Sequence, residues 1–170
     1  MKNYLFLFII LFSLKASAQQ DPLSAFQEKW RNSKAYLLTI AESMPEGKYN
    51  FKPTKREMSF KEQLLHIRQN MLWLGDSYFS EKGSYEENAD EQLNGKEEII
   101  KALSASFDRV YEQIRMADPE KLKETVNFFA GPKTRLQILN LLQDHVTHHR
   151  GQLIVYLNLN EIRPPRYTGW

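Results

Sequence analysis

Apolar residues recur at steps of three and four in four segments of the chain, which is the spacing that places side chains on one face of an α-helix. The four predicted helices cover about residues 22–44, 59–78, 96–116 and 134–157. In the first of them the shared face is formed by Leu23, Phe26, Trp30, Leu37 and Ala41. Each helix therefore has one face to bury against the others.

Signals at the helix ends support these limits. Pro22 suits a first helical turn, where its missing N–H costs nothing. Ser59 and Glu62 have the spacing of a capping box, in which each side chain satisfies a free backbone N–H of the first turn. Thr134 and Gln137 repeat this pattern at the fourth helix.

Four amphipathic helices of about 20 residues are expected to pack as an all-α four-helix bundle. Residues 80–94 form a connection long enough to permit a crossover between the second and third helices, so up-down-up-down order is only one option. Residues 120–132 favour a helical turn and then a short extended piece at 126–129. No segment alternates over enough residues to build a sheet.

The N-terminus has the layout of a secretory signal peptide. Lys2 precedes an apolar run at residues 4–14, and Ala16-Ser17-Ala18 offers a small-residue cleavage site. We therefore expect a signal peptide at 1–18, a single domain at 19–170, and a periplasmic or secreted product that has no membrane attachment after cleavage. The alternative is an N-terminal membrane anchor, because Lys15 lies close to the cleavage point, although the apolar run is shorter than the roughly 20 residues that span a bilayer.

Charge and cysteine content exclude several classes of function. Removal of residues 1–18 leaves 21 basic and 21 acidic residues, without a basic stripe, so the mature chain is not expected to bind nucleic acid or a membrane surface. The chain has no cysteine, which excludes a cysteine nucleophile, a thiolate ligand and a redox pair.

The chemistry of the chain is concentrated in its four histidines. His66 lies on the second predicted helix, and His145, His148 and His149 lie on the fourth. His145 and His149 are four residues apart, which places both imidazoles on one helical face, where they can bind one ion. That face continues the apolar stripe, and polar groups inside such a stripe need partners, which a metal would supply.

Other readings of these histidines remain open from spacing alone. His148 also lies three residues from His145, but it points about 100° away from His149, as a partly exposed histidine would. His66 lies beside the apolar stripe of its helix, which suits either the edge of a cavity or a lone boundary histidine. In a purely structural bundle the histidines would simply form hydrogen bonds.

A site with three imidazole ligands keeps an open position, as catalytic zinc sites do. Nitrogen ligands suit zinc or nickel best, with iron or manganese as alternatives. Zinc proteases carry a glutamate directly after the first histidine of the helical pair, but Val146 occupies that position here. Glu62 is the nearest carboxylate in sequence, and its simpler role is the helix cap.

Three neighbours of the histidines have two readings each. Gly151 inside a helix costs about 1 kcal/mol relative to alanine, which indicates either the close approach of a helix or ligand, or a tolerated surface position. Arg150 and Gln152 have two readings. In one, both orient the metal ligands through hydrogen bonds; in the other, Arg150 forms a surface salt bridge and Gln152 is an amide at the core edge.

Taken together, the motifs resemble the DinB/YfiT-like metal-binding four-helix-bundle family over essentially the whole mature chain. The resemblance rests on Leu64-Leu65-His66-Ile67, on the run from His145 to Leu153, and on three shorter matches, Phe51-Lys52-Pro53, Tyr156-Leu157 and Arg163-Pro164-Pro165. It implies metal ligands at His66, His145 and His149, a water-filled coordination position, and often a homodimer. Some members of the family are transferases or isomerases that use small thiols such as bacillithiol or mycothiol.

Two functions follow as hypotheses. The first is a metal-dependent hydrolase or transferase that acts on a small molecule. The alternative is a non-catalytic, periplasmic metal-binding or stress-related module, expected to be dimeric. Export places the protein away from cytosolic thiols, which weighs against thiol-transfer chemistry.

Overall fold

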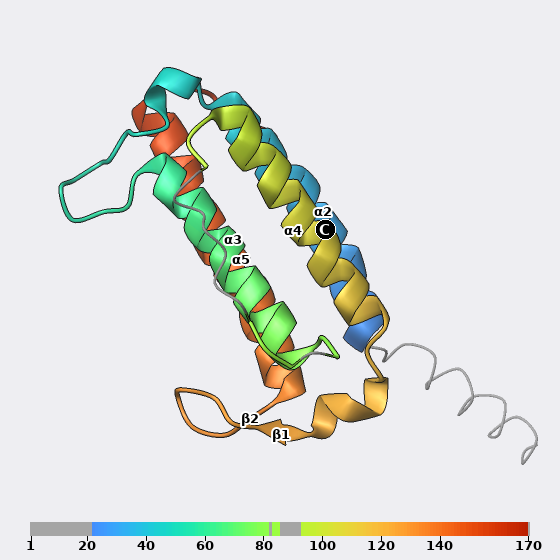
Figure 1. Ribbon diagram of the computed structural model, residues 1–170. Helices are drawn as coiled ribbons and strands as arrows, with labels where there is room; N and C mark the ends of the chain where they lie inside the picture. Colours follow the sequence, from blue (N-terminus) through green and yellow to red (C-terminus); the bar gives the residue numbers. More distant parts are fainter. Residues whose placement is uncertain (1–21, 82, 86–92, 170) are drawn as a thin grey trace, which may run out of the picture.

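The described part of the chain is built around four long α-helices. The computed structural model describes residues 22–81, 83–85 and 93–169. Within these ranges the long helices are α2 (Pro22–Ser43), α3 (Phe60–Tyr78), α4 (Lys96–Arg115) and α5 (Arg135–Leu159) (Figure 1). Each lies within two residues of its predicted limits, which confirms the predicted all-α bundle.

The order of the helices around the bundle differs from their order in the chain. α2 and α3 each pack against both α4 and α5, so α2 lies diagonally opposite α3. Lys61 at the start of α3 contacts Asn94 just before α4, which shows that α3 and α4 run in the same direction. Lys48 after α2 contacts Asn160 after α5, so these two helices are also parallel (Figure 1). The chain therefore crosses the length of the bundle between α3 and α4, as the long connection permits.

Local capping interactions form as the sequence predicts. The Ser59 side chain accepts a hydrogen bond from the Glu62 backbone N–H, while the Glu62 carboxylate accepts one from the Ser59 N–H. Thr134 and Gln137 form the same reciprocal pair at α5. These caps satisfy backbone groups that have no partner inside their helices, and so they fix where α3 and α5 begin.

The interior is apolar and includes aromatic contacts between helices. Trp30 on α2 is 1% exposed, stacks on Phe26, and lies 4.7 Å from the Phe107 ring of α4 between ring centroids. Its indole N–H donates to the Phe107 carbonyl at 3.0 Å. A buried tryptophan thus keeps its polar atom satisfied, as stable cores require.

The segment before α5 is a short hairpin and differs in detail from the predicted extended piece. A 3-10 turn at Pro119–Lys123 leads into β1 (Thr125–Val126), which pairs antiparallel with β2 (Lys133–Thr134). The extended part begins one residue earlier than predicted and is shorter, because Phe128 and Phe129 lie in the turn between the strands, where they contact Trp73.

The close approach expected at Gly151 is found at another glycine. A Cβ on Gly151 would have no neighbour within 4 Å, and the residue is exposed, so no helix of the described chain packs against it and the surface position is the reading that fits this chain alone. Gly75 on α3 is the tight position, because a Cβ there would come within 2.5 Å of the Gln113 side chain and 3.0 Å of Val110 on α4.

We expect opposite effects from alanine at the two glycines. Gly151→Ala should raise the free energy of unfolding by about 0.5–1 kcal/mol, because alanine is the better helix former. Gly75→Ala should lower it, because the new methyl group displaces Gln113 from its 2.6 Å hydrogen bond to buried Asp76. Urea unfolding of both variants measures the difference, and equal shifts would contradict this account.

The predicted signal peptide at 1–18 lies outside the described residues. None of the described helices is both long enough and apolar enough to cross a membrane.

Candidate metal centre

Three of the four histidines meet between α3 and α5. His66 comes from α3, and His145 and His149 lie one turn apart on α5. One ring nitrogen from each can be chosen so that all three lie within 4.8 Å of one another. The ring centroids of the three possible pairs are 4.4–4.8 Å apart. The structure thus brings together the three histidines singled out in the sequence.

The shortest distance in the cluster fits a shared ion. His66 Nε2 and His145 Nε2 are 3.1 Å apart. Two nitrogens bound to one tetrahedral zinc at about 2.0–2.1 Å are separated by roughly 3.3 Å. His145 Nδ1 is buried and has no hydrogen-bond partner among the described residues, so the protein satisfies this ring only in part. The donor set therefore fits a metal ion such as zinc.

The third histidine is oriented by an amide from the opposite helix. His149 Nδ1 lies 2.5 Å from the Oε1 atom of Gln63, which is buried on α3. An amide oxygen only accepts hydrogen bonds, so this contact places the proton of His149 on Nδ1 and leaves Nε2 with a free lone pair. Such a contact on the far side of the ring is how proteins orient histidine ligands.

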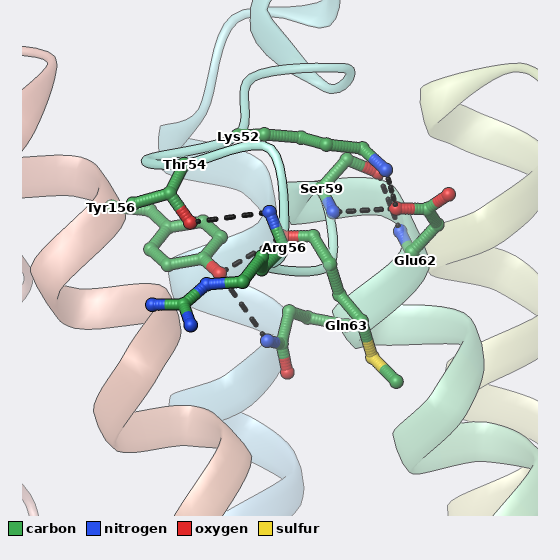
Figure 2. Close-up of polar contacts among 8 residues, drawn as sticks. Lys52, Thr54, Arg56, Ser59, Glu62, Gln63 and Tyr156 are labelled. Carbon is green, nitrogen blue, oxygen red and sulfur yellow. Dashed lines mark hydrogen bonds and ion pairs between the residues drawn. The ribbon is translucent and has the colours of Figure 1, made fainter.

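Gln63 is itself held by two residues of α5. Its Nε2 lies 2.5 Å from Gln152 Oε1 and 3.3 Å from the hydroxyl of Tyr156. Tyr156 in turn donates to the backbone carbonyl of Met58 at 2.9 Å (Figure 2). Gln152 thus contacts the side chain that orients His149, which matches the first of the two roles predicted for it, that of ordering the site.

The remaining histidine stays outside the cluster. His148 is exposed, and its Nε2 contacts Gln152 Nε2 at 2.9 Å. The 145/149 pair therefore faces α3 and the 145/148 pair does not, as the continuation of the apolar stripe indicates.

Arg150 has a role that the sequence did not reveal. It is 5% exposed, and its guanidinium carbon lies 5.0 Å from the centre of the Tyr36 ring on α2. Its Nη1 donates to the Ser33 hydroxyl at 3.4 Å. The residue is neither a surface salt bridge nor a neighbour of the metal cluster, because one step along α5 turns it toward α2.

Burial keeps the three imidazoles neutral. Burial, followed by the neighbouring His149 and His66 rings, lowers the pKa of His145 to about 3. Burial, with a contribution from His66, lowers the pKa of His149 to about 4, and burial also lowers the pKa of His66. Neutral imidazole is the form that binds metals, so the site is ready for an ion at neutral pH.

These pKa shifts predict acid sensitivity of the metal-free protein. In the unfolded chain the histidines titrate near 6.5, so between about pH 6.5 and pH 4 the unfolded state binds more protons than the folded state. The histidine contribution to stability should therefore be fully present above pH 6.5 and fall as the pH falls toward 4. Urea midpoints across this range measure it, and His145→Gln should flatten the slope. An unchanged slope in that variant would contradict the assignment.

A cleft opens on one side of the cluster, beside His66. Its walls come from α3 and from the loop before it, residues 52–58. Glu62 faces this cleft, but Lys52 and the Ser59 N–H hold its carboxylate (Figure 2). The hydrogen bond from Lys52, followed by the one from the Ser59 backbone, lowers the pKa of Glu62 to about 2. Glu62 thus serves as a cap and not as a proton acceptor at neutral pH.

Sequence reasoning missed Gln63 and Tyr156 as parts of the site. Gln63 lies in the buried stripe of α3, one turn before Ile67. A polar amide at a core position facing a histidine pair is the signal that could have found it.

We expect Gln63 to control metal affinity through the His149 ring. Gln63→Leu should weaken zinc binding about 10- to 100-fold, as loss of such supporting contacts does. Gln63→Glu should retain most of the affinity, because a carboxylate oxygen accepts the same N–H. Competition with a zinc indicator measures both variants, and equal losses would show that Gln63 acts only through packing.

Comparison with known proteins places this geometry in a family. An uncharacterized protein of Bacillus subtilis (strain 168), YjoA, is 23% identical over 119 residues, which are 69% of this chain and 77% of YjoA. The crystal structure of YjoA, a DinB-like protein, superposes with a TM-score of 0.70 at 19% identity, covering 84% of this chain and 96% of the other. A DinB-like protein from Bacillus cereus ATCC 10987 gives a TM-score of 0.71 at 15% identity, covering 85% and 97%. The sequence profile of the DinB family matches residues 17–167, and the chain belongs to that family.

Proposed function

We propose that this protein binds one divalent metal ion, zinc or nickel, through His66, His145 and His149, and that it acts on a small molecule as a metal-dependent hydrolase or transferase. The observation that carries the proposal is the meeting of three neutral imidazoles from two helices beside an open cleft. Three histidine ligands leave a coordination position for a substrate or water.

Each part of the site has a defined task in this proposal. A bound divalent ion would supply a Lewis acid, which polarises a carbonyl group and acidifies water. Gln63 holds the His149 ring in its ligand orientation. The Tyr156 contact with the Met58 carbonyl fixes the end of the loop that borders the cleft. His66 lines that cleft, so a substrate would reach the cluster from its side.

Metal analysis of the purified full chain tests the first half of the proposal. One equivalent of zinc or nickel, lost in His149→Ala, is the expected result. Absence of bound metal, together with no change in stability on adding either ion, would refute it. Hydrolysis and transfer substrates screened with wild type and His145→Ala then test catalysis, which should depend on the histidine.

A non-catalytic metal-binding module is the second candidate. It is favoured by the absence of a carboxylate hydrogen bonded to any of the three histidines within the described ranges, since Glu62 is committed to its cap. Normal metal binding with no turnover of any substrate class would favour this alternative.

We further propose that the protein works outside the cytoplasm as a homodimer. Export is supported by the basic, apolar and small-residue order of residues 1–18. Dimerisation is supported by the outer face of α5, where Val155 and Leu159 are 53% and 56% exposed beside the exposed Gly151. Sedimentation of wild type and Val155→Glu tests the dimer, which the charged variant should weaken.

A further inference from the structure

The loop that borders the cleft is tied to two helices. Its first part is tied to α3 by the 2.8 Å ion pair between Lys52 and Glu62, and its last part is tied to α5 by Tyr156. Between these ties, the Thr54 carbonyl accepts from the Glu57 N–H, and the Thr54 hydroxyl accepts from the Arg56 N–H. Such hydroxyl contacts stabilise a tight turn, which places residues 55 and 56 at its tip.

That turn carries two cations without acidic partners. Lys55 and Arg56 form its tip, and neither side chain has an ion pair within the described part of the chain. Figure 2 shows the Arg56 side chain extending away from the Lys52–Glu62 pair. Both residues line the same cleft as His66. Lys52 and Glu62 neutralise each other, which leaves Glu57 as the remaining acid among the residues that line the cleft. The lining therefore carries a net charge of one positive unit, two from Lys55 and Arg56 minus one from Glu57.

We propose that this cleft binds a small molecule with a carboxylate or phosphate group, and that Lys55 and Arg56 hold this group while the rest of the molecule extends toward His66. The inference rests on the proposed function, because it names the class of substrate that the metal site would receive. The planar guanidinium of an arginine can donate two parallel hydrogen bonds to a carboxylate or phosphate, and a lysine adds a point charge. A neutral substrate would leave both cations of the ordered turn unused.

The position of the anion follows from the architecture. The turn belongs to the connection between α2 and α3, and His66 lies on the second turn of α3, so the cations and His66 line one opening from two different segments. The anion would therefore bind outside the metal cluster, and the binding energy of this remote group would orient the reacting part.

Nuclear magnetic resonance of the full, 15N-labelled chain tests the proposal. Methyl phosphate and acetate are titrated separately into protein without metal, and acetamide serves as the neutral counterpart of acetate. We expect saturable shifts at the amides of residues 54–58 and at His66 with at least one anion and none with acetamide. Saturation by methyl phosphate alone assigns a phosphate, and saturation by acetate alone assigns a carboxylate.

Two paired variants separate the cleft from general surface charge. Lys55→Gln with Arg56→Gln should weaken anion binding about tenfold, since each exposed charge contact contributes roughly a factor of two to five. Lys101→Gln with Lys121→Gln, which removes two exposed lysines elsewhere, should leave it unchanged. Equal affinity in the two paired variants, or anion binding that appears only after zinc is added, would overturn the proposal.

The zinc affinity of the same samples is measured without anions. The Lys55/Arg56 variant should keep wild-type zinc affinity. A protein that binds the anion but no zinc would sustain this inference and refute the metal site, whereas the reverse result would refute this inference alone.

Discussion

His149→Ala is expected to lower zinc affinity by more than about a hundredfold, beyond the 10- to 100-fold loss typical of supporting residues. The variant removes a nitrogen donor and leaves Gln63 without the N–H that it accepts. Alanine is the strongest helix former, so the far-ultraviolet circular dichroism of α5 should persist. Competition with a chromophoric zinc chelator measures the affinity.

His148→Ala is the matched control for this prediction. It removes an imidazole from the adjacent position, but that ring is exposed and lies outside the cluster. Its zinc affinity should remain within a few fold of wild type. If the two variants lost affinity equally, the assignment of His149 as a ligand would be wrong.

Zinc is expected to stabilise the whole bundle against heat. Free metal at a hundred times its dissociation constant adds about 2.7 kcal/mol to the free energy of unfolding. For a domain of about 150 residues, each kcal/mol raises the melting temperature by about 2–4 °C, so the shift should be roughly 5–11 °C. The effect arises because the ligands join α3 to α5 and the complete site exists only in the folded chain.

Thermal scans with zinc and with magnesium check this expectation. Magnesium prefers oxygen ligands and should give no comparable shift. His66→Ala should remove the zinc effect while the metal-free melting temperature changes little, because His66 lies at the edge of the cleft. A zinc-dependent shift that persists in His66→Ala would mean that the ion binds elsewhere.

The helices were predictable from the sequence because local and global signals agree in them. The capping pairs at Ser59 and Thr134 define helix starts through neighbouring residues, and the apolar stripes define the buried faces. The order of helices around the bundle was not predictable in the same way. The long connection before α4 permits a crossover, but the choice is made by packing between helices distant in sequence.

In the candidate site, too, local relations were easier to predict from the sequence than tertiary contacts. Helical geometry alone places His145 and His149 on one face, since the relation is local. The partnership with His66 is a tertiary contact over 79 positions, which the sequence indicated mainly through the family resemblance and through the position of His66 beside an apolar stripe. Gln63 was missed because its contact with His149 depends on how α3 and α5 face each other. At Gly151 the expected close approach of another helix is absent within the described chain, because no atom of another helix lies within 4 Å of its Cβ position.

The division of the three histidines between α3 and α5 has a consequence for biosynthesis. α5 is made after α3, and it carries two of the three candidate ligands. A product truncated before α5 retains His66 alone and cannot form the cluster. At the proposed site, metal loading would therefore have to wait until α5 is synthesised and docked, so that metal content would distinguish molecules with a docked α5 from those without one.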